Sequence, residues 1–229
     1  METNFLENNV VVLIGKVTEE KKFSHEIYGE KFYTFKLSVP RLSGNADVIP
    51  VTISERLFKD DELVVGKNVK INGQFRSYNS YEEEKNRLVL TVFAKDIEIL
   101  ENQDDELKAS KDLVSNEITL SGYICKKPIY RQTPFGREIT DILIAVNRAY
   151  NKSDYIPCIA WGRTAKYCAD MEVGTEVKAV GRIQSRSYEK KHEDGTVEER
   201  VAFEVSISKL ELLDENKSEE ENKEENAEA

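Results

Sequence analysis

The sequence predicts an all-β protein built from two tandem copies of one small barrel. The first observation is an internal repeat, because NNVVVLIGKV at 8–17 aligns with SNEITLSGYI at 115–124. The same offset of 107 continues without a gap as far as Arg56. The second observation is that apolar residues recur at every second position in both copies, which is the period of a half-buried strand. We place the two copies at 1–100 and 116–213.

Each copy contains the same segments in the same order. After the aligned first segment, the extended segments are 32–39, 48–54, 68–78 and 87–100 in the first copy, and 138–146, 155–161, 176–188 and 200–213 in the second. A ten-residue stretch between the third and fourth segments, 56–65 or 163–172, is predicted to be a helix that ends at a glycine. Five strands with one short helix in this position are typical of the OB fold, a Greek-key barrel. Four glycines within the strands suit bends or bulges at barrel corners: Gly15, Gly73, Gly122 and Gly181.

The net charge of -10 lies mostly outside the two copies. Residues 214–229 carry eight acids and two lysines and no aromatic or branched apolar residue, so we expect a disordered acidic tail. Residues 101–115 carry five acids and two lysines and are expected to be an acidic linker. The first copy then has a net charge of -2 and the second of +1. The total charge therefore does not exclude a nucleic-acid partner.

Other residue types exclude several classes of function. Cys125, Cys158 and Cys168 are odd in number and have no zinc-binding spacing, and His25 and His192 have no cysteine nearby. We therefore expect no metal site, no cofactor and no catalytic residue, and a protein that is not an enzyme. No apolar run approaches the ~18 residues that a membrane helix needs. The acidic start lacks the layout of a signal peptide, so we expect a cytoplasmic, nucleoid-associated protein.

The second copy combines aromatic and basic side chains, which is the composition that binds single strands by stacking and charge. The aromatic residues are Tyr150, Tyr155, Trp161 and Tyr188. The basic residues are Arg131, Arg137, Arg148, Arg163, Lys166, Arg182 and Arg186. Each has a plainer alternative: Trp161 as barrel core, Tyr155 as a cross-strand packing residue, Tyr188 and the arginines as solvated surface. The even spacing of Arg182 and Arg186 places both on one face of a strand.

Four runs in the second copy carry a family resemblance: NEITLSGYI, KKPIYRQTPFGREITDILIAVNRAY, DYIPCIAWGRTA and VGTEVKAVGRIQSRSYEKKHEDG. In this order and spacing they resemble the bacterial single-stranded DNA-binding protein family over almost all of 116–213. The resemblance implies sequence-tolerant coating and protection of single-stranded DNA in replication, recombination and repair. It places the four aromatic residues named above where the family stacks bases, and Arg131 and Arg186 near the DNA backbone.

The first copy departs from this pattern. Val48 stands where the second copy has Tyr155, and Ser54 stands where it has Trp161. The matches that remain are Arg41, Arg56, Arg76 and Tyr78, supplemented by Phe35, Phe75 and Tyr81. We expect the first copy to bind DNA weakly or to serve mainly in assembly.

The resemblance also has implications for partners. Because the family works with four OB folds per assembly, two per chain predict a homodimer. Family members commonly end in an acidic tail with an apolar tip that binds replication and repair proteins, but this chain stops at Glu228–Ala229 without such a tip. The tail is instead expected to compete with DNA phosphates for the basic groove. Two alternatives remain: an OB protein for RNA or a primosome-type accessory factor, and an interaction scaffold that binds no nucleic acid.

Overall fold

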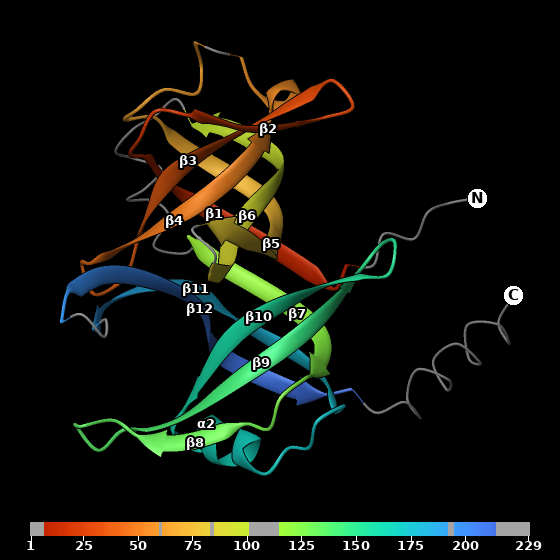
Figure 1. Ribbon diagram of the computed structural model, residues 1–229, viewed down its shortest axis with the longest axis vertical. Helices are drawn as coiled ribbons and strands as arrows, with labels where there is room; N and C mark the ends of the chain where they lie inside the picture. The colour runs from red at the N-terminus through yellow and green to blue at the C-terminus, as the bar shows by residue number, and fades with distance from the viewer. Residues whose placement is uncertain (1–6, 60, 83–84, 101–114, 192–194, 214–229) are drawn as a thin grey trace, which may run out of the picture.

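The computed structural model describes residues 7–59, 61–82, 85–100, 115–191 and 195–213. Most of the predicted linker, 101–114, and the whole predicted tail, 214–229, lie outside the described residues. Figure 1 shows two barrels stacked along the long axis, the first coloured red to yellow and the second green to blue.

The first barrel is built from β1 (Asn9–Val17), β2 (Lys22–Ile27), β3 (Glu30–Pro40), β4 (Ala46–Ser54), β5 (Asn68–Glu82) and β6 (Lys85–Leu100). The strands β1, β3, β4, β6 and β5 follow one another around a ring that closes because β1 pairs with both β3 and β5. Strand β4 runs parallel to β6, and the other neighbours in this ring are antiparallel. Strand β2 pairs with β3 outside the closed ring.

The second barrel repeats this plan with β7 (Asn116–Ile124), β8 (Ile129–Gln132), β9 (Glu138–Arg148), β10 (Lys152–Trp161), α2 (Gly162–Ala169), β11 (Glu176–Lys191) and β12 (Val197–Leu212). Its ring runs β7, β9, β10, β12 and β11, and closes through the pairing of β7 with β9. Two tandem OB barrels are therefore confirmed. The short strands β2 and β8 were not predicted, because every residue of both is exposed and leaves no alternating apolar pattern.

The helix predicted for the first copy is wrong. Among the described residues of this stretch, the only helical turn is the 3₁₀ turn η1 (Glu55–Leu57), which overlaps its start. In the second barrel, α2 buries Ala165 and Cys168, which lie three residues apart on one helix face. The residue equivalent to Cys168 in the first copy is Asp61, and a carboxylate is costly to bury without a partner. Within the described part of the chain, no helix is long and apolar enough to cross a bilayer.

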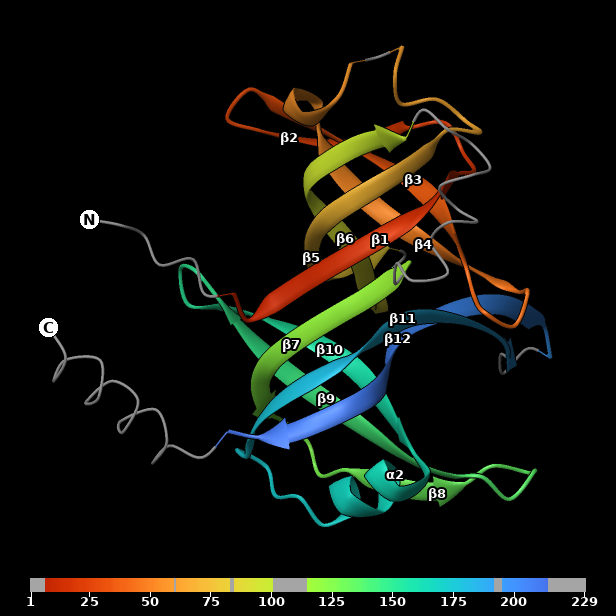
Figure 2. The same cartoon turned by 180° about the vertical axis from the view of Figure 1, so that it is seen from behind.

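The barrels are joined edge to edge by their first strands. Strand β1 runs antiparallel to β7, with Val11 opposite Ile118 at the centre of the paired segment. Figure 2 shows these two strands lying side by side where the barrels meet. Because β1 also pairs with β5 and β7 with β11, one continuous sheet crosses the junction.

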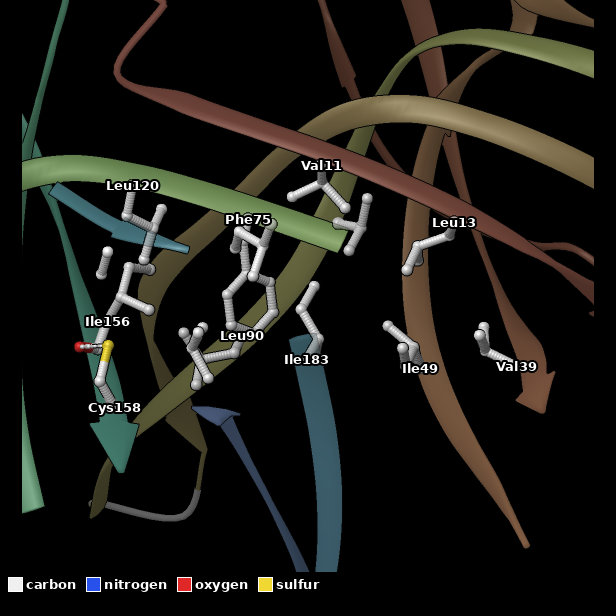
Figure 3. Close-up of a cluster of buried hydrophobic side chains, with 14 of the residues drawn as sticks. Val11, Leu13, Val39, Ile49, Phe75, Leu90, Leu120, Ile156, Cys158 and Ile183 are labelled. Carbon is white, nitrogen blue, oxygen red and sulfur yellow. Dashed lines mark hydrogen bonds between the residues drawn. The ribbon is translucent and has the colours of Figure 1, made fainter. Parts of the chain in front are cut away.

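The buried side chains form one apolar cluster that draws on both barrels. Figure 3 shows part of it, with Phe75 and Leu90 of the first barrel and Leu120 and Ile183 of the second among its members. Phe75 and Leu120 are completely buried. The junction is therefore packed as a continuation of the two cores, so we treat the barrels as one platform for the site.

Two of the four strand glycines mark bulges, as the sequence predicts. The pairing register shifts between Asn72 and Gly73 in β5, and between Val180 and Gly181 in β11. A Cβ on Gly181 would lie 2.2 Å from the carbonyl oxygen of Ser206 on the adjacent strand. Only glycine permits the close approach that bends these long strands around the barrel.

Candidate nucleic-acid interface

Two open grooves lie at the junction of the barrels, and each takes side chains from both. The larger groove, about 410 Å³, is here called the second-barrel groove and is lined by Arg41 from the first barrel and by Arg137, Trp161, Arg182, Gln184, Ser185, Arg186 and Ser206 from the second. The smaller, about 290 Å³, is called the first-barrel groove and is lined by Ser77, Tyr78, Asn79 and Leu88 from the first barrel and by Arg148, Lys152, Ser153 and Tyr155 from the second.

Trp161 lies at the end of β10, on the wall of the second-barrel groove. Its neighbours Ile159 and Ala160 are buried in the core, whereas the indole is half-buried and lines the groove. The indole Nε1 donates a hydrogen bond of 3.1 Å to the hydroxyl of Ser206 on β12. This bond fixes the plane of the ring, so the indole offers a flat surface at a defined angle to the groove.

Arginines surround this aromatic ring. Arg182 and Arg186 lie four residues apart on the same face of β11, and both line the second-barrel groove. Arg137, the residue just before β9, lines the same groove. Arg186 also lies over the ring of Tyr188, 5.7 Å from its centroid. Among the residues that the structure describes, Arg137 and Arg186 have no carboxylate within ion-pairing distance. Their charges are therefore available to an anion in the groove.

A buried carboxylate fixes two further arginines of this groove. Asp47 of the first barrel is completely buried and accepts hydrogen bonds from both Nη2 and Nε of Arg41, the Nε bond being 2.6 Å long. It also accepts bonds from the backbone N–H of Ser185 at 2.7 Å and from Arg182 at 3.4 Å. Burial acts to raise the pKa of Asp47, but the hydrogen bonds from Arg41 and Ser185 outweigh it and leave the pKa below its ordinary value.

The equivalent carboxylate, Asp154 of the second barrel, is hydrogen-bonded to the first barrel. It accepts a hydrogen bond of 2.8 Å from the backbone N–H of Ser77, and the hydroxyl of Ser77 accepts one of 2.7 Å from the N–H of Tyr155. Its arginine, Arg148, is more distant, at 3.5 Å. Burial therefore dominates and raises the pKa of Asp154, with partial compensation from Ser77 and Arg148.

These contacts assign Tyr155 to the groove of the other barrel. Although Tyr155 belongs to β10, it lines the first-barrel groove opposite Tyr78 of β5. Both rings are about half exposed, at 48% and 52%. Lys152, the first residue of β10, lines the same groove and was missed from the sequence, because nothing distinguishes it there from other exposed lysines.

The remaining predicted residues lie outside both grooves. Tyr150 is almost fully exposed at the β9–β10 turn, where its φ is +62°. Arg131 is held by Asp141 through bonds of 2.6 and 3.1 Å, Arg56 pairs with Glu30 at 3.3 Å, and Arg163 is exposed on α2. Tyr188 lies farther along β11, 38% exposed, and Arg76 is half-buried over the ring of Phe93.

Two of the three supplementary aromatics are not part of any surface. Phe35 is 3% exposed and Phe75 is completely buried, so both belong to the core. The side chain of Tyr81 lies outside the described part of the chain. Asp47 and Asp154 were also not singled out from the sequence, although they align in the blocks DVIP and DYIP; their identity in the two copies was the signal that could have found them.

Comparisons with known proteins give the family of the chain. Residues 115–213 match the single-strand binding protein family. A single-stranded DNA-binding protein of Clostridium tetani is 40% identical over 102 residues, which cover 40% of this chain and 69% of that protein. Single-stranded DNA-binding protein B of Bacillus subtilis is 36% identical over 84 residues, which cover 32% of this chain and 72% of that protein.

The similarity in fold extends over both barrels. The crystal structure of the single-stranded DNA-binding protein from Thermus aquaticus superimposes with a TM-score of 0.69, covering 90% of this chain and 93% of that chain at 19% sequence identity. The shared architecture is therefore the tandem pair of barrels.

Proposed function

The chain belongs to the single-strand binding protein family, and we propose that it coats single-stranded DNA without regard to sequence. The observation that supports this most directly is the second-barrel groove, where the oriented indole of Trp161 lies among four arginines. We place its work in the bacterial cytoplasm, at the nucleoid, where strands are exposed during replication, recombination and repair. Its activity is binding, with no covalent step.

The groove combines the two interactions that a single strand needs. A base stacked on an aromatic ring contributes roughly 1–3 kcal/mol whatever its identity, because every base has a π-face. Arg137 and Arg186 lie beside Trp161 and neutralise phosphates on either side of the stacked base. Sequence tolerance follows, because neither interaction reads the hydrogen-bonding edge of a base.

The other predicted residues extend this path in our proposal. Tyr188 and Tyr150 offer exposed rings beyond the groove, and Tyr155 continues it into the first-barrel groove. Arg148, Arg163 and Arg182 serve as backbone contacts. Arg131 and Arg56 contribute less, because a phosphate must displace Asp141 or Glu30 from them.

We propose that two chains form a homodimer that carries four OB barrels. Each chain supplies a first barrel in 1–100, a linker in 101–115, a second barrel in 116–213 and a tail in 214–229. The exposed strands β2 and β8 end the continuous sheet at its two edges. Open edges of this kind favour pairing with another chain.

Titration with oligo-dT tests the proposed function. Trp161 is the only tryptophan, so its fluorescence reports the second-barrel groove directly. We expect quenching by oligo-dT that weakens at higher salt, and much less quenching by the matched duplex. Poly-U is the control for an RNA-binding protein, and stronger binding to poly-U would favour that alternative. Unchanged fluorescence with no mobility shift at low salt would identify an interaction scaffold instead.

A further inference from the structure

The two barrels carry an aromatic side chain at the same place but on different strands. In the second barrel, Trp161 at the end of β10 bonds to Ser206 of β12. The repeat places Ser54 at the position of Trp161, and the aligned runs TVFAKDIEIL and EVSISKLELL place Phe93 at the position of Ser206. The strand registers agree, because Thr52 pairs with Phe93 just as its equivalent, Ile159, pairs with Ser206. The aromatic residue and the serine have exchanged strands.

A second exchange lies on the adjacent strand. Counting from the bulge glycines, β5 has Gln74 and then Arg76, whereas β11 has Arg182 and then Gln184. In both barrels the arginine donates to the glutamine: Arg76 to Gln74 at 2.9 Å, and Arg182 to Gln184 at 3.1 Å. Each barrel has therefore kept one aromatic and one arginine at this place, in reversed positions.

The exchanged residues of the first barrel are stacked on one another. The guanidinium of Arg76 lies 3.9 Å from the centroid of the Phe93 ring, within the range of a cation–π contact. Gln74 holds its edge through two hydrogen bonds, of 2.9 and 3.3 Å. The Phe32 ring supports Phe93 in turn, with centroids 5.7 Å apart. The guanidinium plane is thus fixed before any ligand arrives.

Arg76 also lacks the carboxylate that neutralises its counterparts. Arg41 and Arg182 both contact Asp47, but within the described ranges no carboxylate forms an ion pair with Arg76. Burial and the nearby charge of Arg148 lower the pKa of Arg76, with only partial compensation from Asp154. A half-buried cation beside a second cation is stabilised by an incoming anion.

We propose that the first barrel has its own subsite for a nucleotide of single-stranded DNA, with the base stacked on the Arg76 guanidinium, which Phe93 supports from its other side, and the phosphate beside Arg148. Guanidinium planes serve as stacking surfaces for bases in the same way as aromatic rings. The subsite continues into the first-barrel groove, because Tyr78 follows Arg76 by two residues on the same face of β5. This inference rests on the proposed function, and it replaces the expectation that the first barrel is degenerate.

The test compares Arg76→Lys and Arg76→Ala with wild type in the full chain. The ligand is oligo-dT of about 30 nucleotides, since one OB fold covers roughly 4–16. Both variants should lose affinity by about 5- to 150-fold, the effect of one stacked base. Arg76→Lys should keep the salt dependence of wild type because it keeps the charge, whereas Arg76→Ala should reduce it. Phe93→Leu, which removes the aromatic support but not the bulk, should also weaken binding.

Two controls keep the result interpretable. Lys36→Ala removes an exposed cation of the same barrel, paired with Glu19 at 2.7 Å, and should bind like wild type. The quenching of Trp161 at saturating DNA should stay unchanged in Arg76→Lys, which shows an intact second barrel. If both Arg76 variants bind oligo-dT as tightly as wild type, the subsite is refuted while the proposed function stands. If wild type itself does not bind oligo-dT, both fail.

Discussion

The carboxylate of Asp47 in the first barrel accepts a hydrogen bond of 2.7 Å from the backbone N–H of Ser185 in the second. Asp154 repeats the contact in reverse, accepting from the N–H of Ser77 at 2.8 Å. The two bonds lie at the two grooves, since Ser185 and Ser77 line one groove each. The orientation of the barrels and the geometry of the grooves therefore depend on the same residues.

Asp47→Ala should destabilise the protein and weaken DNA binding together. It leaves the N–H of Ser185 and the guanidinium of Arg41 without their buried acceptor, and breaking a buried ion pair costs about 3–5 kcal/mol. Urea unfolding measures the stability, and oligo-dT titration measures the affinity. Glu19→Ala breaks the exposed pair with Lys36 and should cost at most about 1 kcal/mol. Similar losses in the two variants would contradict the role given to Asp47.

The two equivalent aspartates should respond to pH in opposite ways. The folded state lowers the pKa of Asp47, so its contribution to stability is present above the unfolded pKa of about 3.9 and is lost as the pH falls through the lower folded value. The folded state raises the pKa of Asp154, so the cost of its charge appears as the pH rises from about 3.9 through the higher folded value.

Urea unfolding of Asp47→Asn and Asp154→Asn between about pH 3 and 7 tests this difference. The stability that wild type gains over Asp47→Asn should shrink as the pH falls, and the difference between wild type and Asp154→Asn should shift in favour of wild type. We attribute the opposite pKa shifts to the positions of the arginines, because Arg41 bonds directly to Asp47 whereas Arg148 lies 3.5 Å from Asp154. If the stabilities of the two variants changed with pH in the same way relative to wild type, the opposite pKa shifts would be excluded.

Trp161→Ala should weaken binding to oligo-dT by about 1–3 kcal/mol. Because the indole is half-buried on a groove wall, its removal should destabilise the fold by less than the ~3–5 kcal/mol typical of a buried tryptophan. Mobility shift and thermal unfolding measure the two effects. Leu13→Ala, in the core, is the matched comparison and should show the reverse ratio of effects. Loss of stability without loss of affinity would indicate that Trp161 is a core packing residue and does not stack on a base.

The repeat predicted the tandem barrels correctly because the alignment of the two copies involves many residues. A single element such as the short helix depends on only a few residues and was harder to predict. The helix predicted for the first copy does not form in the described residues, where Asp61 stands at the position of the buried Cys168 and the stretch before the glycine is one residue shorter than in the second copy. The pairing of β1 with β7 could not be predicted, because an edge strand has the same alternation whether it pairs with another barrel or faces water.

The site was predicted in composition rather than in geometry. Arg182 and Arg186 share one groove, as their spacing indicated, and Trp161 lies in the same groove. Tyr155 instead lies in the groove of the other barrel, where its N–H donates to the hydroxyl of Ser77. The repeat places Phe93 at the position of Ser206 once the insertions after Arg56 are allowed for, but only the bond between Trp161 and Ser206 shows that the exchanged residues are neighbours in space.

Light scattering after size-exclusion chromatography should give the mass of two chains at micromolar concentration. Two chains carry the four barrels that we propose for the assembly, and each 26.3 kDa chain presents exposed edges at β2 and β8. Proline replacements test the edges: Glu26→Pro in β2 should weaken an assembly that uses this edge, because proline removes a donor from the strand. A monomer for wild type at this concentration would refute the homodimer.

Removal of residues 214–229 should tighten DNA binding at low salt. The segment carries eight acids and two lysines, so it attracts the same arginines that bind phosphates. The gain should vanish at high salt, because the screening length falls from about 10 Å at 0.1 M to about 3 Å at 1 M. A full-length variant with the eight acids changed to glutamine or asparagine separates charge from length, and it should behave like the truncation. If the truncated and full-length proteins bind oligo-dT equally at low salt, the tail does not compete for the grooves.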